Sequence, residues 1–284
     1  MMEIDEVPDL ERPVVIAAFE GWNDAAEAAS GVVDHLMDVW DAKVVAAIDP
    51  EDYYDFQVNR PSVGLDDNGF RKLTWPSTHV AVASPPELDR DVILIRGIEP
   101  NMRWRAFTAE LLAAVDDLGA ELVVTFGALL ADSPHTRPIP VTGTATEPEL
   151  IDRLSLTEST YEGPTGIVGV VQDACVRLDL PAVSYWAAVP HYVAQPPCPK
   201  ATLAMLGHLE ELLGTSIPLG DLPEEARAWE RGVDELAGDD EEIADYVRSL
   251  EESRDTADLP EASGEAIARE FERYLKRRGG DAND

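Results

Sequence analysis

Basic residues are scarce in this sequence. Its 284 residues include 22 lysines and arginines against 56 aspartates and glutamates, so the formal net charge is −34. Binding to nucleic acid depends on Lys and Arg side chains that neutralise phosphates, and an anionic membrane surface attracts basic segments. The composition therefore predicts neither a nucleic acid nor a membrane as a partner. Such a charge is typical of a well-solvated surface, and adaptation to basic partners or to a salty cytoplasm is the alternative explanation.

Cysteine and long apolar runs are also scarce. The two cysteines, Cys175 and Cys198, indicate no disulfide framework, which fits a reducing cytoplasm. Cys175 lies among apolar residues of a predicted helix, where a buried, unreactive thiol is expected. The longest apolar run, residues 122–131, is too short to span a bilayer. Residues 1–13 are acidic and lack the apolar segment of a secretory signal. We therefore expect a cytoplasmic protein.

The common signatures of enzymes are missing as well. The sequence contains no G-x-S-x-G nucleophile elbow, no G-x-x-x-x-G-K-[ST] phosphate loop and no H-E-x-x-H metal motif. Three regularly spaced glycines, Gly163, Gly166 and Gly169, lack the order of a dinucleotide fingerprint, and close packing is the simpler explanation for them. We therefore expect no metal and no cofactor.

Short apolar runs alternate with amphipathic segments through the first three quarters of the chain. The runs that indicate buried strands are residues 13–19, 43–49, 91–96, 121–126 and 182–189. The segments with helical spacing of apolar residues are 25–40, 104–118, 147–154, 167–178 and 203–213. This alternation predicts an α/β fold of three layers, αβα, in which helices cover both faces of a mostly parallel sheet.

Three local predictions refine this pattern. Asp24 is expected to cap the helix that follows it, with Glu27 as the second member of a capping box. Residues 70–75 and 79–83 are predicted to form a β-hairpin with each other. Residues 133–146 are predicted to be a loop.

The character of the chain changes near residue 220. Residues 221–284 are acidic and contain no strand-like run, but apolar residues recur at helical spacing in three stripes. The stripes lie within residues 222–236, 243–250 and 267–275. The sequence therefore predicts an α/β domain over residues 1–220 and a small all-helical C-terminal region over residues 221–284.

Polar residues gather where the predicted strands end. In a parallel sheet these ends share one edge, which opens onto the usual ligand crevice. The candidate binding residues at this edge and on nearby loops are Asn23, Asp24, Asp55, Arg60, Glu99, Arg103, His135, Arg137 and His191. Acid, base and imidazole groups together could support general acid–base chemistry. The alternative is structural, with Asn23 and Asp24 capping a helix and the arginines pairing with carboxylates to hold long loops.

Five segments in order resemble the proteasome assembly chaperone 2 family in its actinobacterial form. They read VIAAFEGWNDAAEAASGVVDHL, DYYDFQVNRPSV, IRGIEPNMRWRAF, FGALLADSPHTRP and GPTGIVGVVQDACVRLDLPAVSYWAAVPHYVAQPPCPKATLAML, and they span residues 13–215. The resemblance implies a fold similar to that of purine nucleoside phosphorylases. It also implies a homo-oligomer, with a trimer plausible, and proteasome subunits as partners. The family brings no catalytic residues to transfer.

Two functions follow from these observations. The first is a non-catalytic protein-binding or assembly factor, which the resemblance and the missing enzyme signatures favour. The alternative is an enzyme or small-ligand binder that uses the crevice at the strand ends for a nucleoside or a phosphorylated metabolite. A fold shared with phosphorylases does not by itself establish that activity.

Overall fold

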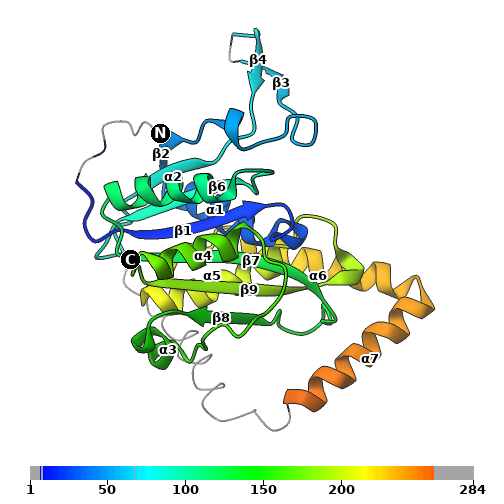
Figure 1. Cartoon of the computed structure of the whole chain (residues 1–284). Helices are drawn as coiled ribbons and strands as arrows, with labels where there is room; N and C mark the ends of the chain where they lie inside the picture. Colours follow the sequence, from blue (N-terminus) through cyan, green and yellow to red (C-terminus); the bar gives the residue numbers. More distant parts are fainter. Residues whose placement is uncertain (1–6, 8, 67, 259–284) are drawn as a thin grey trace.

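A seven-stranded sheet forms the centre of the molecule (Figure 1). The computed structural model describes residues 7, 9–66 and 68–258. The strand order is β2-β5-β6-β1-β7-β9-β8. The bounds are β1 Val14–Glu20, β2 Lys43–Ala47, β5 His79–Ala83, β6 Val92–Ile98, β7 Leu122–Ala131, β8 Val141–Ala145 and β9 Ala182–Pro190.

The sheet is mostly parallel, as predicted. Strand β1 pairs in parallel with both β6 and β7, and β7 pairs in parallel with β9. Strands β5 and β8 run antiparallel to their neighbours, and β2 runs antiparallel to β5 and so in the direction of β6. The first six residues of β1 are buried on both faces, which explains why its sequence is a continuous apolar run.

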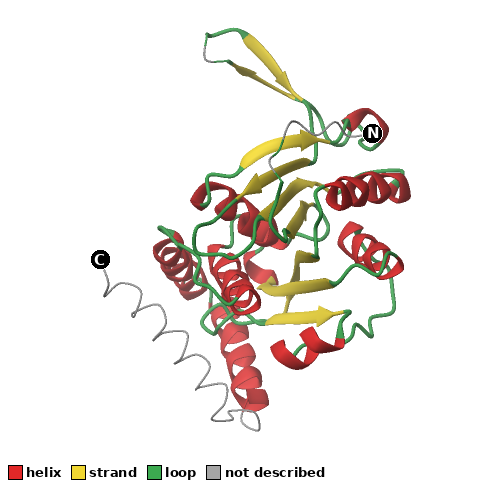
Figure 2. Cartoon of the chain, turned by 90° about the vertical axis from the view of Figure 1, so that its left-hand side faces the viewer, coloured by secondary structure: helices red, strands yellow, loops and turns green. Residues whose placement is uncertain are grey.

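Helices cover both faces of this sheet and complete three layers (Figure 2). Helices α1 (Ala28–Val39) and α5 (Pro199–Leu213) share a core with Val14, Ile16 and Ala18 of β1. Helices α2 (Trp104–Asp117) and α4 (Ile167–Arg177) share the second core with the alternate β1 residues Val15, Ala17 and Phe19. The predicted three-layer αβα architecture is therefore confirmed. Cys175 is fully buried in the second core.

Two further helices follow the α/β part of the chain. Helix α6 (Leu222–Gly238) packs against α5, and α7 (Glu241–Asp258) follows it as a long helix on the outside of the molecule (Figure 1). These helices confirm the first two C-terminal stripes, and the third stripe, 267–275, lies outside the described residues. Leu222 of α6 belongs to the same core as α5. The division of the chain at residue 220 stays a prediction.

The predicted hairpin of residues 70–75 with 79–83 is wrong. Strand β4 (Arg71–Thr74) instead pairs antiparallel with β3 (Ser62–Leu65) in a separate two-stranded sheet, while β5 joins the main sheet between β2 and β6. We call residues 62–66 and 68–74 the ribbon. Figures 1 and 2 both show it projecting from the body of the molecule. Burial explains the difference, because β5 has three buried apolar residues and finds its partners in the core.

Two other local predictions need correction. Residues 141–145, expected as loop, form β8 at the edge of the main sheet beside β9. The first α-helix begins at Ala28, after a 3₁₀ turn over Ala25–Glu27, so Asp24 and Glu27 do not form a capping box. The short helix predicted at 147–154 is present as α3 (Pro148–Leu154). Across the described residues, no helix is both long and apolar enough to cross a membrane.

Candidate functional site

Asn23, Asp24 and Glu99 lie together where β1 and β6 end. The Asn23 side-chain amide donates to Glu99 Oε1 at 2.7 Å, and the backbone N–H of Ile167 donates to the same oxygen at 2.8 Å. Ile167 is the first residue of α4, so the Glu99 carboxylate caps that helix where an anion is favourable. Gly166 allows this close contact, because a Cβ there would lie 2.0 Å from Asn23 Oδ1. Asn23 and Glu99 therefore join the ends of β1 and β6 to the start of α4.

Asp24 performs a related task for α1. Its Oδ1 accepts hydrogen bonds from the backbone N–H groups of Ala29 (2.7 Å) and Ser30 (3.2 Å). Burial raises the pKa of this carboxyl group, and its hydrogen bonds from Ser30 and Ala29 oppose that rise. The turn before the helix holds Ala26 and Glu27 at φ values of 53° and 54°, a left-handed conformation that costs non-glycine residues free energy. Asp24 therefore stabilises a strained entry into α1.

A second group joins the start of α2, where Arg103 lies, to the loop between β2 and the ribbon. Arg103 pairs with Asp52 at 2.5 Å, and its guanidinium lies 5.8 Å from the centroid of the Tyr53 ring. Asp55 accepts a hydrogen bond from the backbone N–H of Gln57 and so closes a local turn. Arg60 is exposed just before β3. These contacts hold the loop that carries the ribbon.

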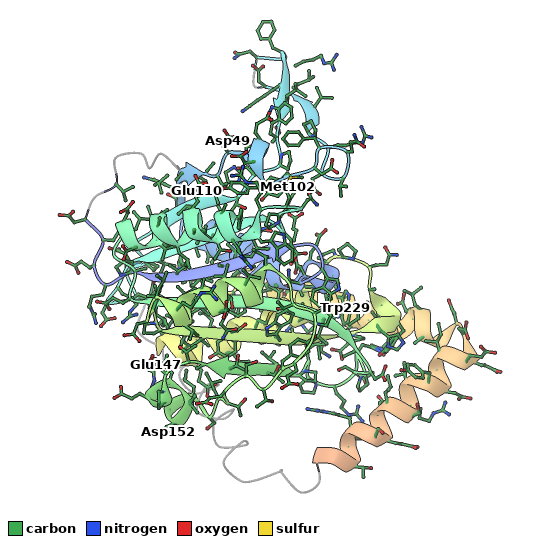
Figure 3. The ribbon with its side chains drawn as sticks, in the orientation of Figure 1. Asp49, Met102, Glu110, Glu147, Asp152 and Trp229 are labelled. Carbon is green, nitrogen blue, oxygen red and sulfur yellow. The ribbon has the colours of Figure 1, made fainter. Side chains whose placement is uncertain are left out.

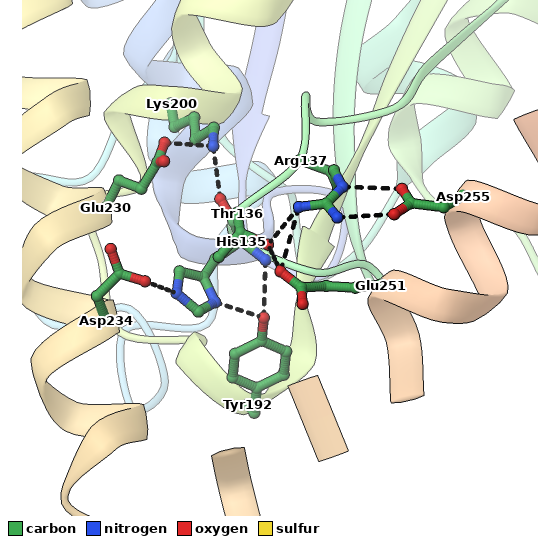
Figure 4. A network of polar contacts seen from close by, with 9 residues as sticks. All are labelled: His135, Thr136, Arg137, Tyr192, Lys200, Glu230, Asp234, Glu251 and Asp255. Carbon is green, nitrogen blue, oxygen red and sulfur yellow. Dashed lines mark hydrogen bonds and ion pairs between the residues drawn. The ribbon is translucent and has the colours of Figure 1, made fainter. Parts of the chain in front are cut away.

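A third group ties the loop after β7 to α6 and α7 (Figure 4). His135, 1% exposed, bonds Tyr192 through Nδ1 (2.8 Å) and Asp234 through Nε2 (3.0 Å). Arg137 makes two hydrogen bonds to Asp255, at 2.8 and 2.9 Å, and pairs with Glu251 at 3.2 Å.

Lys200 extends this third group by pairing with Glu230 of α6 and donating to the carbonyl of His135. His191 lies 3.3 Å from Asp132 and packs edge-on against Tyr192 and Tyr246. We call the contacts of Arg137 with α7 the latch.

Eight of the nine candidate residues therefore fall into three groups of contacts, and Arg60 is exposed beside the second group. The contacts of Asp24, Arg103 and Arg137 are of the kind that the structural alternative describes. The role of the nine residues as a ligand crevice stays a prediction. Among the described residues, no group of three or more His, Cys, Asp or Glu side chains is arranged to hold a metal ion.

A pocket of about 740 Å³ lies at the end of β1, where Gly21 and Trp22 contribute to its lining. It opens between the carboxyl-terminal parts of β7 and β9, the start of α4 and the loop that precedes it. Its lining is uncharged and includes Trp22, Leu129, Leu130, Tyr161, Gln172 and Trp186. Trp22 follows β1 directly, at the edge where ligands of α/β sheets bind. The sequence pattern indicated this edge through its polar residues and missed the aromatic ones, although Trp22 lies beside Asn23.

Comparisons with known proteins identify the family. A model of the PAC2 family matches residues 18–237. A PAC2 family protein from Streptomyces avermitilis is 60% identical, with a TM-score of 0.78 over 83% of this chain and 99% of that one. A proteasome-assembly chaperone homologue from Mycobacterium tuberculosis is 53% identical, with a TM-score of 0.75 over 82% of this chain and 99% of that one.

A more distant structure shares the fold alone. The archaeal proteasome activator PbaB from Pyrococcus furiosus is 18% identical, with a TM-score of 0.65 over 83% of this chain and 98% of that one. A search of curated proteins finds no match. The resemblance that the five sequence segments indicated is confirmed by the family model and by the two similar structures: the chain belongs to the PAC2 family.

Proposed function

We propose that this chain is a non-catalytic protein-binding factor that assists the assembly or activity of a proteasome. The observation that carries the proposal is that Glu99 and His135, two candidates for acid–base chemistry, are held in contacts within the protein. Glu99 Oε1 accepts two hydrogen bonds, and both ring nitrogens of His135 have a partner. A general base needs a free atom within reach of its substrate. Polar groups that are already bound within the protein stabilise its structure and are poorly placed to act as acids or bases.

The descriptions of two similar structures support a role connected with the proteasome. One relative is called a proteasome-assembly chaperone homologue, and one protein of the same fold is called a proteasome activator. We infer proteasome subunits or their precursors as partners of this chain, in the cytoplasm.

Helix α7 is the surface that we assign to such a partner. Its outer face exposes the carboxylates of Glu241, Glu242, Asp245 and Glu252. Complementary charge favours encounter with a basic surface and makes the association rate depend on salt.

The experiment reconstitutes the interaction from purified components. The full chain is mixed with proteasome α subunits and with unprocessed β subunits of the same host, at low and moderate salt, and complexes are followed by native mass spectrometry. The variant Glu242→Lys/Glu252→Lys should weaken binding by about tenfold or more, because each substitution reverses a charge. The matched control Glu149→Lys/Asp152→Lys reverses two exposed charges on α3 (Asp152 is labelled in Figure 3) and should bind normally. A wild-type chain that binds no subunit at either salt would refute the proposal.

The alternative, a small-ligand binder, depends on the 740 Å³ pocket. Its lining contains no Lys or Arg, so a phosphate group would find no cationic partner there, and an uncharged nucleoside fits better than a nucleotide. Isothermal titration with nucleosides and with their monophosphates decides the question. Saturable binding of a nucleoside that is lost in Trp186→Ala would favour this alternative, and no heat with any of them would exclude it.

A further inference from the structure

The ribbon presents an apolar face that nothing in the described chain covers. All eight residues of β3 and β4 are exposed. Side chains alternate between the two faces of a strand, and the register pairs Val63 with Leu73 and Leu65 with Arg71. Val63, Leu65 and Leu73 therefore share one face with Arg71, whereas Lys72, which pairs with Gly64, lies on the other face. Leu65 is 73% exposed. Figure 3 shows the ribbon, with its side chains, projecting from the body of the molecule.

Such exposed apolar side chains indicate that the ribbon binds a partner. An isolated two-stranded hairpin is at best marginally stable in water, and exposed apolar patches mark interaction sites. Phe70, just before β4, adds a large side chain that is 71% exposed. Trp75 at the base packs on Phe56 with ring centroids 4.8 Å apart, which anchors the ribbon while its tip stays free.

The charge of the ribbon indicates what kind of partner it meets. Arg71 and Lys72 directly follow Phe70, and both are exposed. They form a basic pair in a chain whose net charge is −34. Arg71 lies on the apolar face, so this face fits an apolar pocket with an acidic rim.

The chain carries such a pocket itself. The uncharged pocket of about 740 Å³ is lined by Trp22, Leu129, Leu130 and Tyr161, and these four side chains are between 45% and 67% exposed. The loop that supplies Ser159 and Tyr161 to the lining also bears Glu158 and Glu162, both exposed. Apolar surface and charge are therefore both complementary to the ribbon tip.

One molecule cannot join its own two surfaces. The ribbon lies in the connection between β2 and β5, at one edge of the main sheet. The pocket lies over β7, β9 and β8, at the opposite edge. Only a second copy can bring a ribbon to this pocket.

We propose that the ribbon of one copy inserts Phe70 and the Val63–Leu65–Leu73 face into the pocket of a second copy, with Arg71 against Glu158 and Glu162. The interface is head-to-tail, because each copy gives a ribbon on one side and a pocket on the other. Repetition of such an interface closes into a ring when the rotation permits. This inference concerns contacts between copies and goes beyond the proposed function.

Complementary variants test the interface. The ribbon variant is Leu65→Asp/Phe70→Asp, and the pocket variant is Trp22→Glu. All three positions are exposed in the single chain, so folding should be preserved, and circular dichroism checks it. Each variant alone should sediment at the mass of one chain, 31.0 kDa, while the wild type sediments as a multiple of it. An equimolar mixture should form a one-to-one dimer and nothing larger, because one intact ribbon and one intact pocket remain.

Two controls make the outcome decisive. Leu178→Asp alters another exposed apolar residue and should leave the wild-type mass unchanged. Arg71→Glu should weaken association, and mixing it with Glu158→Lys/Glu162→Lys should restore it. A monomeric wild type at micromolar concentration, a pocket variant that still associates, or a mixture that stays monomeric would overturn the proposal. Because only this chain is present, none of these results depends on binding to a proteasome.

Discussion

At the scale of single residues, Glu99 joins the ends of two strands to the start of α4. One oxygen of its carboxylate accepts from Asn23 and from the first backbone N–H of α4. We expect Glu99→Ala to lower the free energy of unfolding by about 1–3 kcal/mol, because two donors lose their acceptor. Glu99→Gln keeps an acceptor and should cost less. Urea denaturation measures both, with the exposed Glu149→Ala as the control. An unchanged midpoint in Glu99→Ala would contradict this account.

Asp24 gives the stability curve a defined dependence on pH. Burial raises its pKa in the folded chain. The folded state therefore holds this proton more tightly than the unfolded state, so the contribution of Asp24 is fully present below the ordinary aspartate pKa of about 4. It is lost as the pH rises through the raised folded pKa.

The variant Asp24→Asn should remove this dependence. The difference in unfolding free energy, wild type minus variant, should fall as the pH rises from about 4. Urea titrations at several pH values measure it, and Asp116→Asn on the surface of α2 is the reference. A difference that grows with pH would show that the ionised carboxylate is the stabilising form.

The sequence predicted the position of these residues better than their purpose. Strand ends located Asn23, Asp24 and Glu99 at one edge, and the structure brings Asn23 and Glu99 into contact. Whether a carboxylate caps a helix or faces a substrate depends on which N–H groups approach it. Ile167, the second donor to Glu99, is 68 residues away in the chain, and no spacing rule reveals it.

At the scale of elements, the latch holds α7 against the loop after β7. Arg137 is 34% exposed and its partners Glu251 and Asp255 are 26% and 55% exposed, so solvent screens both pairs and each contributes little to stability. We expect Arg137→Ala to speed hydrogen exchange of α7 backbone amides about two- to tenfold, with little change in the main sheet. Arg227→Ala, which removes a charge from α6, is the control. Equal protection of α7 in Arg137→Ala would show that its other contacts, among them those of Val247 and Leu250, hold it without the latch.

Elements with a buried apolar run were predictable, and exposed or short ones were not. The central strands appear as continuous apolar runs because both of their faces are covered. Strand β8 reads Val-Thr-Gly-Thr-Ala at the sheet edge, and its small polar residues resemble a loop. The hairpin was mispaired because proximity in sequence favours pairing of neighbouring runs, whereas the actual partner of β4 is β3, on its other side in sequence.

At the scale of the whole molecule, a net charge of −34 opposes compaction. Salt at about 0.15 M reduces the Debye length to about 8 Å and screens this repulsion. We expect the melting temperature to rise between low and moderate NaCl, by about 2–4 °C for each kcal/mol gained. Potassium and choline chlorides should act alike if screening is the cause. Hydrogen exchange of the α7 backbone amides should instead become faster as the salt concentration rises, because salt screens the ion pairs of the latch. A melting temperature that falls with salt would show that local pairs outweigh the global repulsion.

The ribbon has one more consequence, for how such a protein can diversify. It shares no backbone pairing with the main sheet, so its length and sequence can vary without shifting the register of any core strand. Mutations in the ribbon are therefore limited by the surface that the ribbon must fit, and not by the folding of the rest of the chain. Exchange of the ribbon alone can therefore change how copies of this fold assemble, while the rest of the fold stays the same.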